Sequence, residues 1–201
     1  MSSTATALRL ASVVLVAAIA LALTISPPAH AGLGLACPDA TSQVFRSWGD
    51  AANYALVPDG GFEAGASGWA LTGDARVVAG NEPYHLHAST DRSSLRLAAG
   101  ATTTSPQMCI GLLSSKMRFV LGGTAGSTVR VQVIYRGPLS SVLGIFDGGT
   151  AKTSGTWAPS PELSMLGGFL PLLTQSVQFR FVALSGAVMI DDVYLDPWKK
   201  T

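Results

Sequence analysis

The sequence predicts an all-β protein, a single antiparallel β-sandwich of the jelly-roll type that is preceded by a cleaved signal peptide. Two observations predict this fold: apolar and polar side chains alternate in several short segments, and glycine or proline separates these segments. Residues 128–136 show it best, with three valines and Tyr135 on one face and two arginines and a glutamine on the other. Such alternation indicates a strand with one buried and one solvated face. Many short strands with turn residues between them are typical of a sandwich or jelly roll.

The first 31 residues are typical of a signal peptide. Arg9 precedes an unbroken apolar run at residues 13–23, and Ala29-His30-Ala31 matches the small-residue cleavage pattern. The alternative is a membrane anchor, but this run is shorter than the span of about 20 residues that a bilayer needs. We therefore expect a signal peptide at 1–31, an N-terminal arm at 32–55, a sandwich domain at 56–198 and export from the cell, with the protein secreted or at the cell surface.

The charge of the remaining chain excludes some partners. Cleavage removes Arg9, one of the 13 basic side chains, and none of the 12 acidic ones, so the net charge becomes zero. Outside Lys199-Lys200 there is no run of basic residues. We therefore expect no nucleic-acid partner, no anionic-lipid partner and no membrane span after cleavage.

The two cysteines, Cys37 and Cys109, would lie in an oxidising compartment, and a disulfide between them is the default interpretation. It would stabilise the fold by roughly 4 kcal/mol in the chain-entropy model. The alternative is a lipid-modified N-terminus at Cys37, because Leu35-Ala36-Cys37 loosely resembles a lipoprotein site. That alternative leaves Cys109 unpaired.

The remaining strands follow from the same pattern. In the arm, Phe45, Trp48 and Tyr54 are expected to anchor the chain to the outside of the sandwich. Further strands are predicted as a set of short apolar or alternating segments: 56–57, 76–79, 93–98, 108–113, 117–121, 143–146, 177–181 and 188–195. Asp147-Gly148-Gly149 is interpreted as a turn.

Residues 165–173 are apolar without alternation. We expect a buried crossover there. The alternative is an exposed patch for a protein partner, a surface or self-association.

Three segments carry a resemblance to a known family. Residues 59–63 (DGGFE) with 67–69 (SGW), residues 93–97 (SSLRL) and residues 190–195 (IDDVYL) resemble the opening, middle and closing strands of jelly-roll carbohydrate-binding modules and related galactose-binding-like domains. The resemblance spans about residues 56–196 in the family's order. The chain from Cys37 to Trp198 also resembles a group of secreted actinobacterial proteins.

This resemblance implies a structural calcium ion between the first and last strands. Glu63 falls on the family's ligand glutamate, and Asp191 or Asp192 on its ligand aspartate. Asp91 and the carbonyl groups near Gly61 and Arg92 would add oxygen ligands of the kind that calcium prefers. Strand parity places Asp191 on the inward face of Val193 and Leu195, which favours it over Asp192. The alternative is that Glu63 and the aspartate accept backbone hydrogen bonds at a strand end.

The family resemblance also implies a glycan ligand, which such modules hold on exposed aromatic rings. Tyr84 and Trp157 lie in turn-rich segments and are the candidate ligand-binding residues. Trp48 is expected to cover an end of the sandwich, and Trp69 and Tyr135 to enter the core. His85 and His87 are expected to be a solvated pair. A metal site on them would need Glu82 or Asp91 as a further ligand.

No catalytic motif is present in the sequence. It holds no G-x-S-x-G elbow, H-E-x-x-H motif, P-loop or G-x-G-x-x-G loop. Adjacent Asp191 and Asp192 on one strand would point to opposite faces and could not flank a glycosidic bond by themselves. The sequence therefore predicts a non-catalytic carbohydrate-binding module. The alternative is a structural or adhesive protein of the cell envelope that binds a protein partner.

Overall fold

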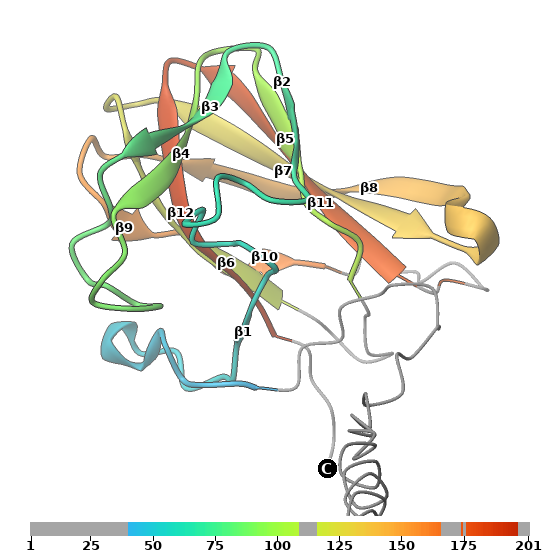
Figure 1. Ribbon diagram of the computed structural model, residues 1–201, viewed down its shortest axis with the longest axis horizontal. Helices are drawn as coiled ribbons and strands as arrows, with labels where there is room; N and C mark the ends of the chain where they lie inside the picture. Colours follow the sequence, from blue (N-terminus) through green and yellow to red (C-terminus); the bar gives the residue numbers. More distant parts are fainter. Residues whose placement is uncertain (1–39, 109–115, 166–173, 175, 197–201) are drawn as a thin grey trace, which may run out of the picture. The chain divides into compact units, whose positions relative to one another are not determined.

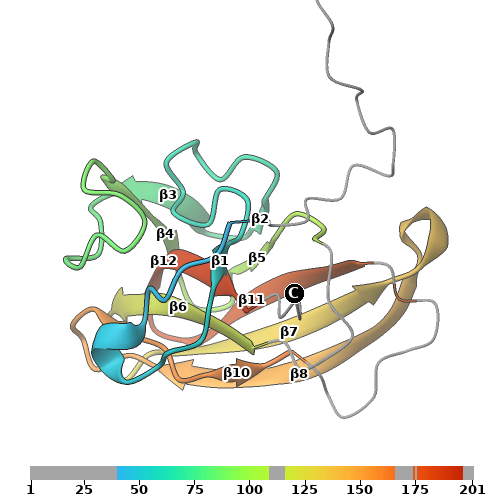
Figure 2. The ribbon, with the colours of Figure 1, turned by 90° about the horizontal axis from the view of Figure 1, so that it is seen from below.

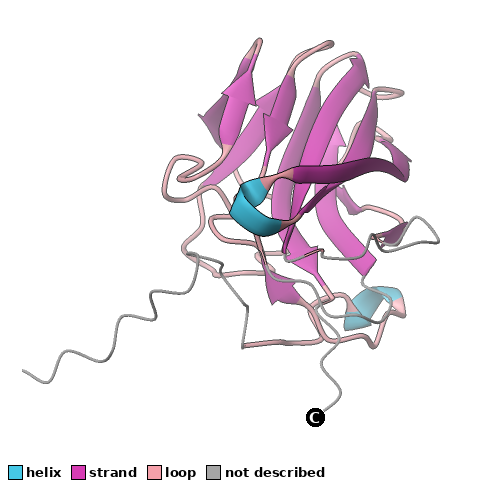
Figure 3. Ribbon diagram, turned by 90° about the vertical axis from the view of Figure 1, so that its right-hand side faces the viewer, coloured by secondary structure: helices cyan, strands magenta, loops and turns pink. Residues whose placement is uncertain are grey.

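The computed structural model describes residues 40–108, 116–165, 174 and 176–196. The chain divides into two compact units, Met1–Gly34 and Leu35–Thr201, and every described residue belongs to the second. Strands make up about half of the described chain, together with two short 3-10 helices, Arg46–Trp48 and Pro138–Ser140 (Figure 3). The predicted signal peptide, Cys37, Cys109 and residues 166–173 lie outside the described residues. Within the described ranges, no helix has the length and apolarity needed to cross a membrane.

Two antiparallel sheets form the sandwich (Figure 1), as predicted. The first has the order β10-β6-β12-β4-β3, with β1 paired to β12 and β9 paired to β6. Its strands are β1 (Ala55–Leu56), β3 (Ala75–Ala79), β4 (Ser93–Leu97), β6 (Lys116–Gly123), β9 (Ala158–Pro159), β10 (Leu163–Ser164) and β12 (Val188–Leu195). The second has the order β2-β5-β11-β7-β8, with β2 (Ala70–Thr72), β5 (Thr102–Thr104), β7 (Thr128–Arg136), β8 (Val142–Lys152) and β11 (Ser176–Ser185).

A single apolar core fills the space between the sheets. Alternate residues of β7, β11 and β6 enter it, which is why these segments show a period of two. Trp69 and Tyr135 are buried in this core, as predicted. The indole nitrogen of Trp69 donates a hydrogen bond to the Pro58 carbonyl oxygen over 2.9 Å, so its one polar atom is satisfied.

β12 carries an irregularity that overturns the predicted orientation of Asp191. Its register with β6 shifts between Asp191 and Tyr194, and the backbone at Asp192 has a φ of 49°. Asp191 lies opposite Val120, outside the core cluster, whereas Ile190 and Val193 both enter the core. The bulge thus reverses the parity on which the prediction depended, and Asp191 does not share the inward face of Val193.

The predicted turn at residues 147–149 is wrong. These residues lie inside β8, opposite a register shift at Val131/Gln132 of β7. Gly149 has a φ of 120°, so the two glycines permit an irregular strand rather than a reversal of the chain.

The arm lies on the outer face of the first sheet, as predicted, alongside β6 (Figure 2). Phe45 and Tyr54 are fully buried and pack with Tyr194 of β12. The Arg118 guanidinium lies 4.6 Å from the centre of the Phe45 ring and donates a 2.9 Å hydrogen bond to Asp50. This buried ion pair fixes the arm against β6.

Candidate functional site

Three aromatic residues from distant segments form what we call the ring cluster: Trp48, Tyr84 and Trp157. The Trp48 and Tyr84 rings meet edge to face with their centres 4.9 Å apart. The Tyr84 hydroxyl donates a 2.7 Å hydrogen bond to the backbone carbonyl of Trp157. The structure therefore brings the Tyr84 hydroxyl to the backbone of Trp157, the other predicted ligand-binding residue. It adds Trp48, which the sequence analysis assigned to a covering role.

The ring cluster is exposed to solvent. Trp48 is 38% exposed and Tyr84 is 40% exposed, and among the described residues no other aromatic side chain is classed as exposed. The Trp157 ring is half-buried against the backbone of Gly122 in β6, where a Cβ atom would lie 2.7 Å from the ring. The Trp157 indole therefore packs directly against Gly122.

The loop between β3 and β4 carries Tyr84 and reaches the arm (Figure 1). Its conformation depends on the fully buried carboxylate of Glu82, whose two oxygens accept hydrogen bonds from the backbone nitrogens of Tyr84 and Leu86. The backbone nitrogen of Glu82 in turn donates a 3.1 Å hydrogen bond to Asp191 of β12. A chain of hydrogen bonds therefore joins the Tyr84 backbone to the sheet.

Four buried carboxyl groups gather beneath this loop, and we call them the carboxyl cluster: Glu82, Asp91, Asp191 and Asp192. Burial raises the pKa of Asp191 to about 8, against the partial opposing effect of backbone hydrogen bonds from Glu82 and Asp192. The pKa of Asp192 is raised as well, first by burial and then by the charge of Asp191 and the Glu82 side chain. Four such groups cannot all be ionised at low cost unless a cation joins them.

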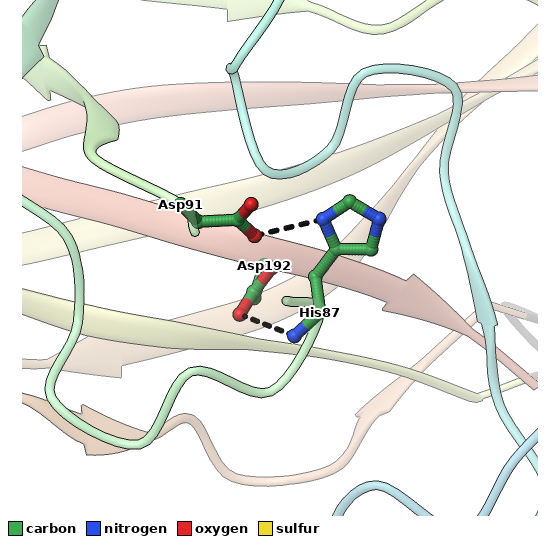
Figure 4. Close-up of side chains that lie close together, drawn as sticks. All are labelled: His87, Asp91 and Asp192. Atoms are coloured by element: carbon green, nitrogen blue, oxygen red, sulfur yellow. Dashed lines mark hydrogen bonds and ion pairs between the residues drawn. The ribbon is translucent and has the colours of Figure 1, made fainter. Parts of the chain in front are cut away.

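His87 lies against the carboxyl cluster (Figure 4). Its Nδ1 atom is 2.8 Å from a carboxylate oxygen of Asp91, and its backbone nitrogen donates a 3.3 Å hydrogen bond to Asp192. Both histidines are exposed, as expected, but His87 is also held by Asp91. His85 is exposed, and its Nδ1 lies 3.4 Å from the Asn81 side-chain nitrogen.

The four residues predicted to hold calcium are only partly brought together. Asp91, Asp191 and Asp192 belong to the carboxyl cluster. One oxygen of Glu63 accepts hydrogen bonds from the backbone nitrogens of Arg92 and Ser93, at 2.8 and 2.6 Å. The alternative interpretation of Glu63 predicts such backbone hydrogen bonds at a strand end. Calcium binding stays a prediction.

From the sequence, Trp48 is interpreted as a covering residue, His87 as one of a solvated pair, and Glu82 only as a ligand that a metal site on the histidines would need. Each acts through a partner far away in the sequence: Glu82 and His87 contact β12 residues more than a hundred positions later. The sequence nevertheless holds a signal, since Glu82 and Asp91 lie within six residues of the two histidines.

Comparisons with solved structures show that the fold is shared. The tailspike protein 4 enzymatically active domain of bacteriophage CBA120 is 15% identical with a TM-score of 0.51, and the match covers 70% of this chain and 21% of that chain. The N-terminal endo-1,4-beta-D-xylanase 10B of Clostridium thermocellum, with its CBM22-1 and GH10 modules and xylohexaose, is 16% identical with a TM-score of 0.51, covering 73% and 29%. TmCBM61 in complex with beta-1,4-galactotriose is 18% identical with a TM-score of 0.47, covering 71% and 98%.

The first two of these chains are much longer than the part that this protein matches, about a fifth and less than a third of their lengths. At such identities the likeness shows the fold alone. No family model matches the sequence. No curated protein matches it either.

Proposed function

We propose that the protein is a non-catalytic carbohydrate-binding module that holds its glycan on the ring cluster. The observation that carries this proposal is that Trp48 and Tyr84, the exposed aromatic side chains of the described chain, form one pair. A sugar ring presents apolar C–H faces that pack on an aromatic ring and hydroxyl groups that need polar partners. Asn81 and His85 on the Tyr84 loop and Arg46 on the Trp48 helix supply polar groups on the same two segments.

The shared fold supports this proposal as a scaffold, because the matched structures include a chain with a carbohydrate-binding module and bound xylohexaose. Fold alone does not carry a function, so the proposal depends on the ring cluster. The carboxyl cluster offers no rival catalytic site, since its side chains are at most 7% exposed. A glycosidic bond needs two carboxyl groups that both reach the substrate.

A glycan array with the purified protein tests the proposal. We expect binding to at least one glycan class, and a Tyr84→Ala variant should weaken it at least tenfold, equivalent to about 1.4 kcal/mol. Leu184→Ala is the matched control, because Leu184 is 43% exposed and lies on β11, outside the ring cluster. Absence of binding to every glycan would reject the function, and equal binding by the Tyr84 variant would reject the site.

Gly122→Ala provides a second test that leaves all three aromatic residues in place. The added Cβ atom would lie 2.7 Å from the Trp157 ring, so the indole must move away from residue 122. We expect several-fold weaker glycan binding with the fold retained, measured by calorimetry and circular dichroism. Unchanged affinity would show that the position of Trp157 does not matter.

We also propose that the protein acts outside the cell after removal of residues 1–31, because the apolar run and the Ala-x-Ala pattern support export. N-terminal sequencing of the exported protein should begin at Gly32. Intact mass after thiol alkylation tests the proposed pair of Cys37 and Cys109, which should stay unlabelled until reductant is added. A lipid adduct at Cys37 would support the alternative.

The β7–β8 hairpin favours a second candidate function, attachment to a protein partner in the cell envelope. Leu139 at its tip is 92% exposed, and Val142 and Ile145 are about half exposed. Of the apolar segment 165–173, only Met165 is described, and it is buried in the core. Replacement of Leu139 with serine should abolish such attachment to cells and leave glycan binding intact.

A further inference from the structure

We propose that His87, Asp91 and Asp192 form a divalent-cation site with a nitrogen ligand, suited to Zn²⁺ rather than to Ca²⁺. Their three ligand atoms, one from each side chain, lie within 4.8 Å of one another. His87 and Asp91 come from the β3–β4 loop and Asp192 from the bulge of β12, so the fold itself brings them together (Figure 4). This proposal does not depend on glycan binding.

The distances fit an ion of this kind. The His87 Nδ1 and Asp91 oxygen atoms are 2.8 Å apart. Two ligands of a tetrahedral zinc ion with bonds of 2.0–2.1 Å would be about 3.3 Å apart. This pair must therefore move apart by about half an ångström, and a pair at the 4.8 Å limit would have to close by about 1.5 Å. The His87 side chain is 43% exposed and that of Asp91 only 5%, so the ion can enter past the imidazole.

An unpaired oxygen is the second observation that points to a ligand. Asp192 is 1% exposed, and its Oδ1 atom has no hydrogen-bond partner among the described residues. A Cβ atom added to Gly61 would lie 3.3 Å from this oxygen, 3.5 Å from His87 Nδ1 and 3.8 Å from Asp91 Oδ2. The three atoms thus converge on one place, and a glycine keeps a side chain out of it. A buried acceptor without a partner destabilises the folded protein, and a bound cation would satisfy it.

The local charge also calls for a cation. Four carboxyl groups interact here, and within the described chain His87 is the only basic side chain within ion-pair distance of any of them. Burying charges without partners is costly, and a divalent ion compensates two of them at once.

The imidazole nitrogen of His87 determines which metal ion the site prefers. Nitrogen ligands suit zinc and its neighbours in the first transition row, whereas calcium takes six to eight oxygen ligands. Glu63, on which the calcium expectation depends, is absent from this group of ligand atoms. We therefore expect affinity to fall in the order Zn²⁺, Mn²⁺, Ca²⁺.

Isothermal titration of ZnCl₂, MnCl₂ and CaCl₂ into protein purified without a histidine tag and stripped with EDTA tests the site. We expect one Zn²⁺ per chain and at least a tenfold loss of affinity in His87→Ala. His85→Ala is the matched control, because His85 is exposed on the same loop but outside the ligand group. Equal affinity of the His87 variant and the wild type would overturn the proposal, as would an equal loss in the control.

Gly61→Ala keeps every ligand but places a methyl group beside them, and it should also weaken Zn²⁺ binding while the fold persists. Tighter binding of Ca²⁺ than of Zn²⁺ would overturn the proposal and support the calcium that the family resemblance implies. In that case, Glu63→Gln should weaken Ca²⁺ binding, and His87→Ala should not.

Discussion

At Gly60 the backbone leaves no room for a side chain. An added Cβ would lie 2.7 Å from the Val193 carbonyl oxygen and 2.9 Å from that of Val57. The Val193 nitrogen donates a 3.0 Å hydrogen bond to the Gly60 carbonyl, so this turn is joined directly to β12. The glycines of the opening motif therefore allow the first and last strands to meet.

Gly60→Ala should lower the free energy of unfolding by about 2 kcal/mol, because backbone atoms cannot move aside as a side chain can. Urea denaturation in EDTA measures it. Gly61→Ala is the control, since its nearest neighbour is a side-chain oxygen at 3.3 Å. Equal losses in the two variants would contradict this explanation.

At the scale of elements, the strands best predicted from the sequence were those with undisturbed alternation. β7 spans 128–136, as predicted, because it alternates against a continuous core, whereas β12 spans the predicted 188–195 although a bulge interrupts its alternation. The bulge in β12 and the glycines in β8 were not predicted, since both depend on the register of a neighbouring strand. The carboxyl cluster was predicted in part: the motifs identified the aspartates, but contacts across the fold were needed to add Glu82 and His87.

The arm depends on a second carboxylate, Asp50. Burial by itself would raise the pKa of Asp50, but hydrogen bonds from Tyr54, Ala52 and Arg118 outweigh it and lower the pKa. A lowered folded-state pKa means that this contribution to stability is complete above the ordinary value of about 3.9. It is lost as the pH falls through the folded-state value.

Asp50→Asn should therefore destabilise the protein by about 3 kcal/mol at pH 7, because it leaves Arg118 buried without its partner. The difference from the wild type should shrink below about pH 4, where both side chains are neutral. Chemical denaturation between pH 3 and pH 7 measures it. A difference that is constant with pH would refute the role of the charge.

A further prediction concerns Glu82, which holds the β3–β4 loop. In the wild type, the two oxygens of Glu82 accept hydrogen bonds from the backbone nitrogens of Tyr84 and Leu86. Glu82→Gln leaves only one acceptor oxygen, so the loop loses one of these two hydrogen bonds. It also removes one acid from the carboxyl cluster, which relieves repulsion. Glycan affinity should fall several-fold while the melting temperature of ion-free protein stays the same or rises. A fall in both would indicate general destabilisation instead.

For the whole molecule, the two sheets depend on one shared core. The Phe181 ring of β11 is fully buried, and its centre lies 5.2 Å from that of Phe119 in β6 and 6.1 Å from that of Trp69. The sequence indicated that these residues face inward, but it could not indicate which of them meet, because pairing across a sandwich is not local.

Phe181→Ala should cost about 4 kcal/mol of unfolding free energy, since it removes an aromatic side chain shared by both sheets. Leu184→Ala on the same strand is exposed and should cost less than about 0.5 kcal/mol. Urea denaturation of both variants measures the contrast. A small loss for Phe181 would mean that the two sheets do not unfold together.

The bridge between Ser42 and Tyr54 lies within the arm, which is held to the sandwich by the pairing of β1 with β12, a small aromatic cluster and the Asp50–Arg118 pair. So few contacts make it a segment that opens before the sandwich does. Amide hydrogens of Ser42 and Tyr54 should therefore exchange with solvent sooner than those of β7 and β11. Each opening would carry Trp48 away from Tyr84, so the ring cluster would come apart in molecules whose core is intact. The affinity of the ring cluster would then include the free energy of closing the arm, and a glycan bound there should slow exchange in the arm itself.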